Sequence, residues 1–412
     1  MKNIFTFLLL SIGLSVNAQD DIIDQPSESG LQVVTENGNR GYRLIYSSYY
    51  NHGDIGSNAV DLSYSNSFSS TRGATGSYSI AMGYNTTASG TASTASGYSS
   101  TASANYSTAM GYFTTASGTE STAMGKGTTA SGYASTAMGS DTRASGSYST
   151  AMGYYTIASG NFSTAMGVST TASEFASTAM GYETTASGNQ STAMGKNTTA
   201  SGAFSTAMGN YTTASEFAST AMGNNTTASG HHSTAMGRNT VASDYASVVI
   251  GQYNSSGSTA TSATSFSTSA PAFVIGNGTG NSSRSDAFKV MFNGDATVSN
   301  DLTVNGDVTV SSDARLKANI VSLGATLSKL LNIDGKTYTV KKNGAQKIGV
   351  LAQDIQEVFP ELVSEDKEGM LSVNYQGFIP VLINALKEQQ KEIEYLRAQE
   401  KRIDRLEQLI QN

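Results

Sequence analysis

A 14-residue repeat without insertion or deletion constrains the fold more than any other feature of this sequence. Methionine recurs in the motif A-M-G at positions 82, 110, 124, 138, 152, 166, 180, 194, 208, 222 and 236. Ser96 fills the gap in that series, and Ile250 closes it in the same phase, which makes thirteen units. A disordered Ser/Thr/Gly tract places no demand on phase, so the strict period indicates a stack of coils.

Each unit contains a half-period, because A-M-G returns seven residues later as A-S-G. Ser, Thr and Gly are poor helix formers, and helical repeats need longer units. We therefore expect two short strands per coil, with a turn after each and glycines such as Gly83 and Gly90 at the strand ends. None of the four prolines interrupts the repeat, as a continuous strand ladder requires. Thirteen coils at about 4.8 Å each predict a rod of roughly 60 Å.

Side chains in the segment S-T-A-M-G alternate between the two faces of a strand. The alanines suit a very narrow interior, where nothing larger fits. The methionines then form an apolar stripe along the outside, which makes sense if rods associate through it. An alternative is that the methionines themselves fill the core.

The pattern S-x-A-[MI]-G…A-S-G, over about residues 77–256, resembles the YadA-type head of trimeric autotransporter adhesins. The resemblance implies a left-handed parallel β-roll in each chain and three rolls packed side by side. The sequence departs from that family in having Met where the family usually has Ile or Val. It does not show the family's C-terminal membrane barrel, so we expect neither autotransport nor anchoring in an outer membrane.

The N-terminal residues 1–18 are predicted to be a secretory signal peptide. Lys2 supplies the positive end, an apolar run follows, and small residues precede Gln19. The run is short for a membrane anchor, the alternative reading of this segment. Residues 19–75 contain strand-like pieces and no site that can be named. The chain has no cysteine, which excludes disulfides and thiol nucleophiles, and its net charge of −7 does not favour a nucleic-acid partner.

Residues 257–311 are predicted to form a β-rich neck or stalk. The segments AFVIGNG and AFKVMFNG are typical of strands followed by Asn-Gly turns. NGDATV at 293–298 and NGDVTV at 305–310 are expected to be short strand units twelve residues apart.

The composition changes at residue 312, and residues 312–412 are predicted to form an α+β domain. Asn343-Gly344 indicates a hairpin, a helix is expected to stop at Pro360, and a long helix is expected over about 378–412. Apolar residues at heptad spacing predict a self-associating coiled coil in this last helix. The alternative is one amphipathic helix packed on its own domain. The heptad residues are Leu382, Leu386, Ile393, Leu396, Ile403 and Ile410.

Three segments of this domain, SDARLKANI, IGVLAQDIQEVFPELV and VNYQGFIPVLINALKEQQ, occur in order. They resemble the endosialidase-type intramolecular chaperone of phage tailspikes and tail fibres, over residue 312 to about 402. The resemblance implies that the domain drives trimerisation of the fibre before it and then cuts itself off with a Ser-Lys dyad. It implies Ser312 as nucleophile, Lys317 as base and Ser311–Ser312 as the scissile bond.

The implied chemistry makes demands on structure. A serine hydroxyl is a weak nucleophile, and a lysine serves as its base only where burial leaves the amine neutral. A spacing of five does not put two side chains on one face of a helix or strand. A bend or a neighbouring chain must therefore complete the dyad. Without the family pattern, Ser312 and Lys317 are simply an N-cap serine and a surface lysine.

These observations predict a mainly β, obligately trimeric chain that is secreted or displayed at the cell surface. We expect an adhesin-like fibre with an unknown cell-surface, matrix or glycan ligand, no cofactor, no metal and no turnover enzyme. The pair His231–His232 has no other ligands around it and is interpreted as surface decoration.

Two other functions are alternatives to this prediction. A polysaccharide-degrading enzyme needs carboxylates roughly 5–9 Å apart, and the repeat places Glu174, Glu216 and Asp244 two or three coils apart. An ice-binding rod needs a flat outer ladder of threonines. The candidate threonines are at positions 114, 128, 142, 156, 170, 184, 198, 212, 226 and 240.

Overall fold

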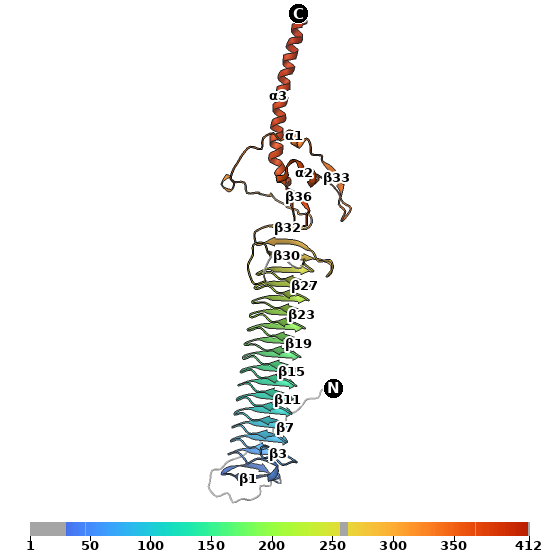
Figure 1. Ribbon diagram of the computed structural model, residues 1–412. Coiled ribbons are helices and arrows are strands. Elements are labelled where there is room, and N and C mark those ends of the chain that lie inside the picture. Colours follow the sequence, from blue (N-terminus) through green and yellow to red (C-terminus); the bar gives the residue numbers. More distant parts are fainter. Residues whose placement is uncertain (1–29, 46, 256–262, 367, 411–412) are drawn as a thin grey trace. The chain divides into compact units, whose positions relative to one another are not determined.

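The computed structural model describes residues 30–45, 47–255, 263–366 and 368–410 (Figure 1). The predicted signal peptide, residues 1–18, lies outside the described residues. The chain divides into two compact units, 1–303 and 304–412, and each is treated separately below.

The first unit is a parallel β-solenoid in which every coil contributes one long and one short strand (Figure 1). The predicted half-period and the predicted parallel β-roll are confirmed. The long strands are β5 (Ile80–Tyr84), β7 (Thr94–Tyr98), β9 (Thr108–Tyr112), β11 (Thr122–Lys126), β13 (Thr136–Ser140), β15 (Thr150–Tyr154), β17 (Thr164–Val168), β19 (Thr178–Tyr182), β21 (Thr192–Lys196), β23 (Thr206–Asn210), β25 (Thr220–Asn224), β27 (Thr234–Arg238) and β29 (Val248–Gln252). The short strands are β4 (Gly73–Ala74), β6 (Thr87–Ala88), β8 (Thr101–Ala102), β10 (Thr115–Ala116), β12 (Thr129–Ala130), β14 (Arg143–Ala144), β16 (Ile157–Ala158), β18 (Thr171–Ala172), β20 (Thr185–Ala186), β22 (Thr199–Ala200), β24 (Thr213–Ala214), β26 (Thr227–Ala228) and β28 (Val241–Ala242).

Strands of successive coils pair in register, so like residues stack on like. Met138 lies opposite Met152 in the long ladder, and Ala158 lies opposite Ala172 in the short ladder. The coils come so close that the A-M-G glycine has no room for a side chain. A Cβ on Gly153, which has φ +125°, would lie 2.0 Å from the carbonyl oxygen of Gly167. The repeat therefore keeps glycine for close approach of backbones as well as for turning.

The interior of the solenoid is a column of alanines, serines and threonines. The alanines of both ladders, such as Ala151 and Ala158, are completely buried. The methionines alternate to the outside, where Met82 and Met110 are 37% and 40% exposed. The prediction of an outer methionine stripe is confirmed, and the alternative that methionines fill the core is wrong, since alternation along the strand assigns the inside to alanine.

The prediction that the threonine ladder considered for ice binding lies on the outer surface is also wrong. The threonines from 114 to 240 at 14-residue intervals are 0% to 1% exposed and face the interior. The residue that follows each of them, such as Thr171 after Thr170, is the one that alternates to the outside. An interior ladder cannot present a surface to ice.

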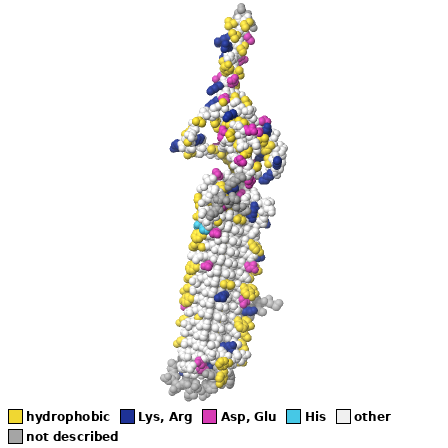
Figure 2. Space-filling model, in the orientation of Figure 1, with side chains coloured by type: hydrophobic (Ala, Val, Ile, Leu, Met, Phe, Trp, Pro, Cys, Tyr) yellow, Lys and Arg dark blue, Asp and Glu magenta, His cyan; other side chains and the backbone are white. Residues whose placement is uncertain are grey.

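Aromatic side chains line the two corners of the coils, where each strand ends in a turn. Figure 2 shows hydrophobic side chains along both edges of the repeat, with few charges on the face between them. At one corner, the rings of Tyr84, Tyr98 and Tyr112 stack at centroid distances of 4.9 and 5.1 Å. Such stacking covers much of the face of each ring.

Other strands extend the solenoid at each end. The hairpin of β1 (Leu31–Glu36) and β2 (Asn39–Leu44) precedes β3 (Val60–Tyr64), which pairs in parallel with β2 and β5. A 3-10 turn, η1 (Tyr49–Asn51), lies between β2 and β3.

At the other end, β30 (Pro271–Asn277) pairs in parallel with β29 and is followed by antiparallel β31 (Asp286–Met291) and β32 (Ala296–Val298). The predicted strands at AFVIGNG, AFKVMFNG and NGDATV are confirmed. NGDVTV at 305–310 is not a strand, and that prediction is wrong for the single chain. The described chain supplies no neighbouring strand, and Val308 and Val310 remain 62% and 60% exposed.

The second unit is a small α+β arrangement around Ile355, Phe359, Leu362 and Val381. The predicted hairpin at Asn343-Gly344, the helix before Pro360 and the long final helix are confirmed. Its elements are η2 (Ala314–Leu316), α1 (Leu327–Leu330), β33 (Lys336–Thr339), β34 (Gln346–Gly349), α2 (Ala352–Val358), η3 (Pro360–Leu362), β35 (Val363–Glu365), β36 (Leu371–Val373), η4 (Tyr375–Gly377) and α3 (Phe378–Ile410).

Only the start of α3 packs on its own unit, through the buried residues Val381 and Ala385. Farther along, Leu396, Ile403 and Leu409 are 56%, 54% and 73% exposed. The coiled coil remains a prediction, because it needs a partner helix. None of the helices within the described ranges has the length and apolar character to cross a membrane.

The tight interior makes a direct prediction for the short ladder. Ala172→Val should lower the free energy of unfolding by roughly 1–3 kcal/mol, because two extra methyl carbons have no space between coils. Thr171→Val, on the outer face of the same strand, should change it by less than about 0.5 kcal/mol. Thermal denaturation followed by circular dichroism measures both, and equal effects of the two substitutions would contradict the alanine core.

Candidate self-cleavage site

Ser311 and Ser312 lie in an extended stretch that precedes η2, the first turn of the second unit. Residues 304–313 form no helix or strand, and every residue from 301 to 325 is exposed in the single chain. The predicted scissile bond, Ser311–Ser312, is therefore in a segment that is accessible and has no ladder hydrogen bonds to break.

The turn at η2 brings the two predicted dyad residues together. Asp313 is its N-cap, and the carboxylate accepts a hydrogen bond from the backbone N–H of Arg315 at 2.8 Å. The Arg315 guanidinium also donates to this carboxylate, and these bonds lower the pKa of Asp313. Lys317 ends the turn by donating its backbone N–H to Ala314. The chain thus folds back on itself within five residues.

As a result, Nζ of Lys317 donates a hydrogen bond to Oγ of Ser312 at 2.6 Å. The expected bend exists, and no second chain is needed to bring the two side chains into contact. In this bond the amine is the donor, whereas a general base accepts the serine proton. The two side chains are close enough for proton transfer. Transfer of the Ser312 hydroxyl proton to Lys317 requires an environment that favours the neutral amine.

That environment is missing from the single chain, because Ser312 and Lys317 are both exposed. Nearby apolar side chains are exposed as well: Leu316, Ile320 and Val321 are 71%, 68% and 85% exposed. Exposed apolar groups beside an exposed dyad are typical of a surface that another chain covers.

A carboxylate that the sequence did not reveal fixes the segment after the dyad to the long helix. Glu388 of α3 accepts hydrogen bonds from the backbone N–H groups of Thr326 and Leu327, at 2.7 and 3.0 Å. These are unpaired N–H groups at the start of α1. The hydrogen bonds, first that from Thr326, lower the pKa of Glu388. Nothing in the sequence marks Glu388 among the several acidic residues of that helix.

The other polar residues considered from the sequence do not form a site. Nε2 of His231 lies 3.1 Å from a carboxylate oxygen of Glu216. Within the described ranges, no three His, Cys, Asp or Glu side chains come together in a way that could hold a metal ion. Glu174, Glu216 and Asp244 each lie opposite a glycine of the preceding coil. Their spacing of two or three coils, about 10–14 Å, is too wide for a glycosidase pair.

Models of known protein families match segments in both units of the chain. Residues 312–364 match the model of the chaperone of endosialidase, and the match begins at Ser312. Overlapping and successive two-copy matches to the YadA head domain repeat extend from residue 74 to residue 254. The chain joins a segment similar to YadA head repeats to a segment similar to the endosialidase chaperone. The chaperone match ends before residue 402, where the resemblance was expected to stop.

A curated relative supports the same assignment. The chain is 36% identical over 84 residues to the long tail fiber protein Gp37 of Escherichia phage AR1. The match covers 18% of this chain and only 8% of that protein. The relative is therefore similar in one segment, and it is far longer than the shared region.

The lowered pKa of Glu388 predicts a pH dependence. A carboxyl group with a lowered folded pKa contributes stability that is present above its unfolded pKa, about 4.5, and is lost as pH falls through the folded pKa. Calorimetry should show a lower melting temperature for Glu388→Gln than for wild type at pH 7. This difference should shrink as pH falls below about 4.5.

Glu392→Gln is the matched control, one turn farther along α3, where the side chain is exposed. It should melt like wild type at every pH. A difference between wild type and Glu388→Gln that stays constant down to pH 3 would contradict the role given to the ionised carboxylate.

Proposed function

We propose that this chain is the precursor of a secreted, homotrimeric, adhesin-like fibre. Its C-terminal domain drives trimerisation and is then released by cleavage between Ser311 and Ser312. The contact of 2.6 Å between Lys317 Nζ and Ser312 Oγ, at the first residue of the chaperone match, carries the proposal. The predicted division into 19–75, 76–256, 257–311 and 312–412 is part of it, as are the signal peptide and a cell-surface, matrix or glycan ligand.

The proposed reaction is an acyl shift followed by hydrolysis. Oγ of Ser312 attacks the carbonyl carbon of Ser311 while Lys317 accepts the hydroxyl proton. The C–N bond between the two residues breaks, and the proton passes to the released nitrogen. The Ser311 acyl group is then held as an ester on Ser312. Water hydrolyses this ester, which leaves a carboxylate on Ser311 and a free amine and hydroxyl on Ser312.

Association of three chains supplies what the single chain lacks. In one copy the methionine stripe is partly exposed, and the valines of 302–310 and the apolar residues of α3 beyond Ala385 are exposed. Removing this much apolar surface from water favours association. Close packing around the η2 turn would also exclude water from Lys317 and favour its neutral form. Cleavage then follows assembly.

Two alternatives are less well supported. The carboxylates considered for a polysaccharide-degrading enzyme, Glu174, Glu216 and Asp244, lie two or three coils apart, which is too wide for a glycosidase pair. An ice-binding rod needs threonines on its outer surface, and the candidate threonines lie in the interior.

Substitutions at Ser311, Ser312 and Lys317 test whether these residues carry out the cleavage. Wild type should yield a fragment that begins at Ser312, whereas Ser312→Ala should remain full length, because its side chain has no nucleophile. Lys317→Arg should also remain full length, since arginine keeps the charge and donors but does not accept a proton. Intact mass and N-terminal analysis of the purified proteins measure the outcome.

Ser311→Ala is the matched control, because it changes the acyl side of the bond and keeps the dyad. It should still be cut. Cleavage of Ser312→Ala at the same bond would remove Ser312 from the mechanism, and full-length wild type in trimers would make the domain a retained trimerisation cap.

The methionine face is predicted to be the contact between rods. Replacing Met138, Met152 and Met166 by Lys should strongly reduce the trimer fraction, because three like charges per level would meet in an apolar interface. Light scattering coupled to size-exclusion chromatography measures the oligomeric state.

The control places the same three charges on the opposite ladder of the same region. Thr129, Ile157 and Thr171 point outward from the short strands, and their replacement by Lys should leave the trimer intact. Loss of trimer in the control set alone would assign the contact to the other face.

A further inference from the structure

A pocket of about 200 Å³ opens at the end of the solenoid where the coil stack begins. Two loops form it, one between β2 and β3 and the other between β3 and β4. We call it the tip pocket. Its lining residues are Tyr50, His52, Gly53, Asp54, Phe68, Ser69 and Ser70.

The two loops of the tip pocket are hydrogen-bonded to each other. Ser69 donates its backbone N–H to the carbonyl of Tyr50 at 3.1 Å, and Gly53 donates to the carbonyl of Arg72 at 2.9 Å. The Asn51 side chain donates to the carbonyl of Ser65 at 2.8 Å. Gly53 also permits close contact, since a Cβ there would lie 2.5 Å from the carbonyl oxygen of Ser70. The walls are therefore held before any ligand binds.

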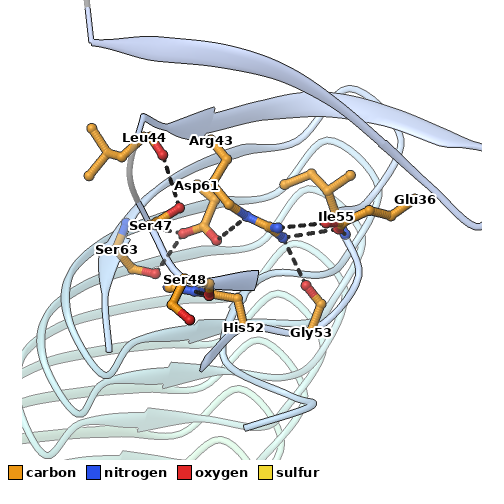
Figure 3. Close-up of polar contacts among 10 residues, drawn as sticks. All are labelled: Glu36, Arg43, Leu44, Ser47, Ser48, His52, Gly53, Ile55, Asp61 and Ser63. Carbon is orange, nitrogen blue, oxygen red and sulfur yellow. Dashed lines mark hydrogen bonds and ion pairs between the residues drawn. The ribbon is translucent and has the colours of Figure 1, made fainter. Parts of the chain in front are cut away.

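A buried ionic network supports the pocket from within the solenoid (Figure 3). Arg43, 2% exposed, contacts Glu36 at 2.7 Å and the fully buried Asp61 at 3.4 Å. It also donates to the carbonyl of Gly53, a pocket residue, at 2.9 Å. His52 is 5% exposed, with Nδ1 3.0 Å from the carbonyl of Ser48.

This network replaces the usual core of the rod. Asp61 pairs with Ala81 of the next coil, and Arg43 pairs with Asp61, so charged residues occupy the interior alanine column. A buried ion pair contributes little net stability compared with apolar packing. The network contacts the pocket loop through Gly53, which indicates that it holds a defined loop geometry at this end of the solenoid.

The chemistry of the lining fits a sugar. Phe68 and Tyr50 are 78% and 70% exposed, and aromatic faces contact the C–H face of a pyranose ring favourably. One oxygen of Asp54 accepts from Asn37, and the carboxylate can accept further hydrogen bonds from hydroxyl groups. The hydroxyl of Ser70 can donate or accept. The pocket is smaller than the roughly 300–1,000 Å³ of drug-sized ligand sites, which suits a single ring.

The aromatic rings at the corners of the rod differ from those of the tip pocket in how their faces are covered. Tyr84, Tyr98 and Tyr112 cover one another's ring faces by stacking. Within the described part of the chain, no such ring contact is found for Phe68. A ring with an open face at the mouth of a pocket is suited to stacking on a ligand.

We infer that the tip pocket binds one pyranose residue of a glycan, with Phe68 and Tyr50 against the ring and Asp54 accepting from its hydroxyl groups. The inference rests on the proposed adhesive function and specifies the class of ligand and the part of the fibre that binds it.

Saturation-transfer NMR on the purified full-length protein tests it, with a panel of methyl α- and β-pyranosides of glucose, galactose, mannose, N-acetylglucosamine and fucose as probes. At least one glycoside should receive saturation at its C–H protons. Its affinity should fall about tenfold or more in Phe68→Ala and in Asp54→Asn, as expected for loss of one main contact. Tyr211→Ala removes an aromatic that is 55% exposed elsewhere on the rod and should bind like wild type.

The outcomes are distinguishable. Absence of binding to every glycoside, equal binding by Phe68→Ala, or loss of binding only in Tyr211→Ala would each overturn the inference. Light scattering on the same samples reports the oligomeric state. A trimer without sugar binding would reject the tip pocket alone, and sugar binding by a protein that never trimerises would reject the proposed fibre.

Discussion

The in-register stacking of 14-residue coils is the constraint on which the rest of the structure depends. Each coil meets the next with alanine on the inside and glycine at the closest backbone contact, as at Gly153 and Gly167. Any insertion would shift one coil against its neighbours and turn inner side chains outward. This explains why most of the variation in the repeat lies at the corners and on the outer faces. The methionine stripe and the aromatic corners are consequences of this register.

A narrow interior also explains why the chain needs partners. Alanine buries little apolar area, so the hydrophobic contribution per coil is small. Larger apolar side chains are on the outside, where association with another copy would cover them. The second unit is similar, with a small core and a long helix whose apolar side chains beyond Ala385 are exposed. The proposed dyad fits the same logic: the η2 turn brings Ser312 and Lys317 into contact within one chain, and association with other chains would exclude water from them.

Much of this architecture was predictable, and the failures have physical causes. Period, half-period, the Asn-Gly hairpin and the helix before Pro360 are local signals, and all are confirmed. The threonine ladder was misassigned because two threonines are adjacent in most coils, and the corner before them resets the alternation. NGDVTV carries strand residues but has no neighbour in the single chain. The contact of Ser312 with Lys317 was predicted only as a need for a bend. Neither the hydrogen bonds of Glu388 to Thr326 and Leu327 nor the tip pocket has a local sequence signature, because each brings together residues that are far apart in the sequence.

The central claim is that the Ser311–Ser312 bond is cut only after three chains assemble. Cell-free synthesis of the wild-type chain at several concentrations, followed over time by native mass spectrometry, tests it most directly. The account predicts that uncut trimer precedes the fragments and that the cleavage rate rises steeply with chain concentration. Correctly cut monomer, appearing at a rate independent of concentration, would contradict it.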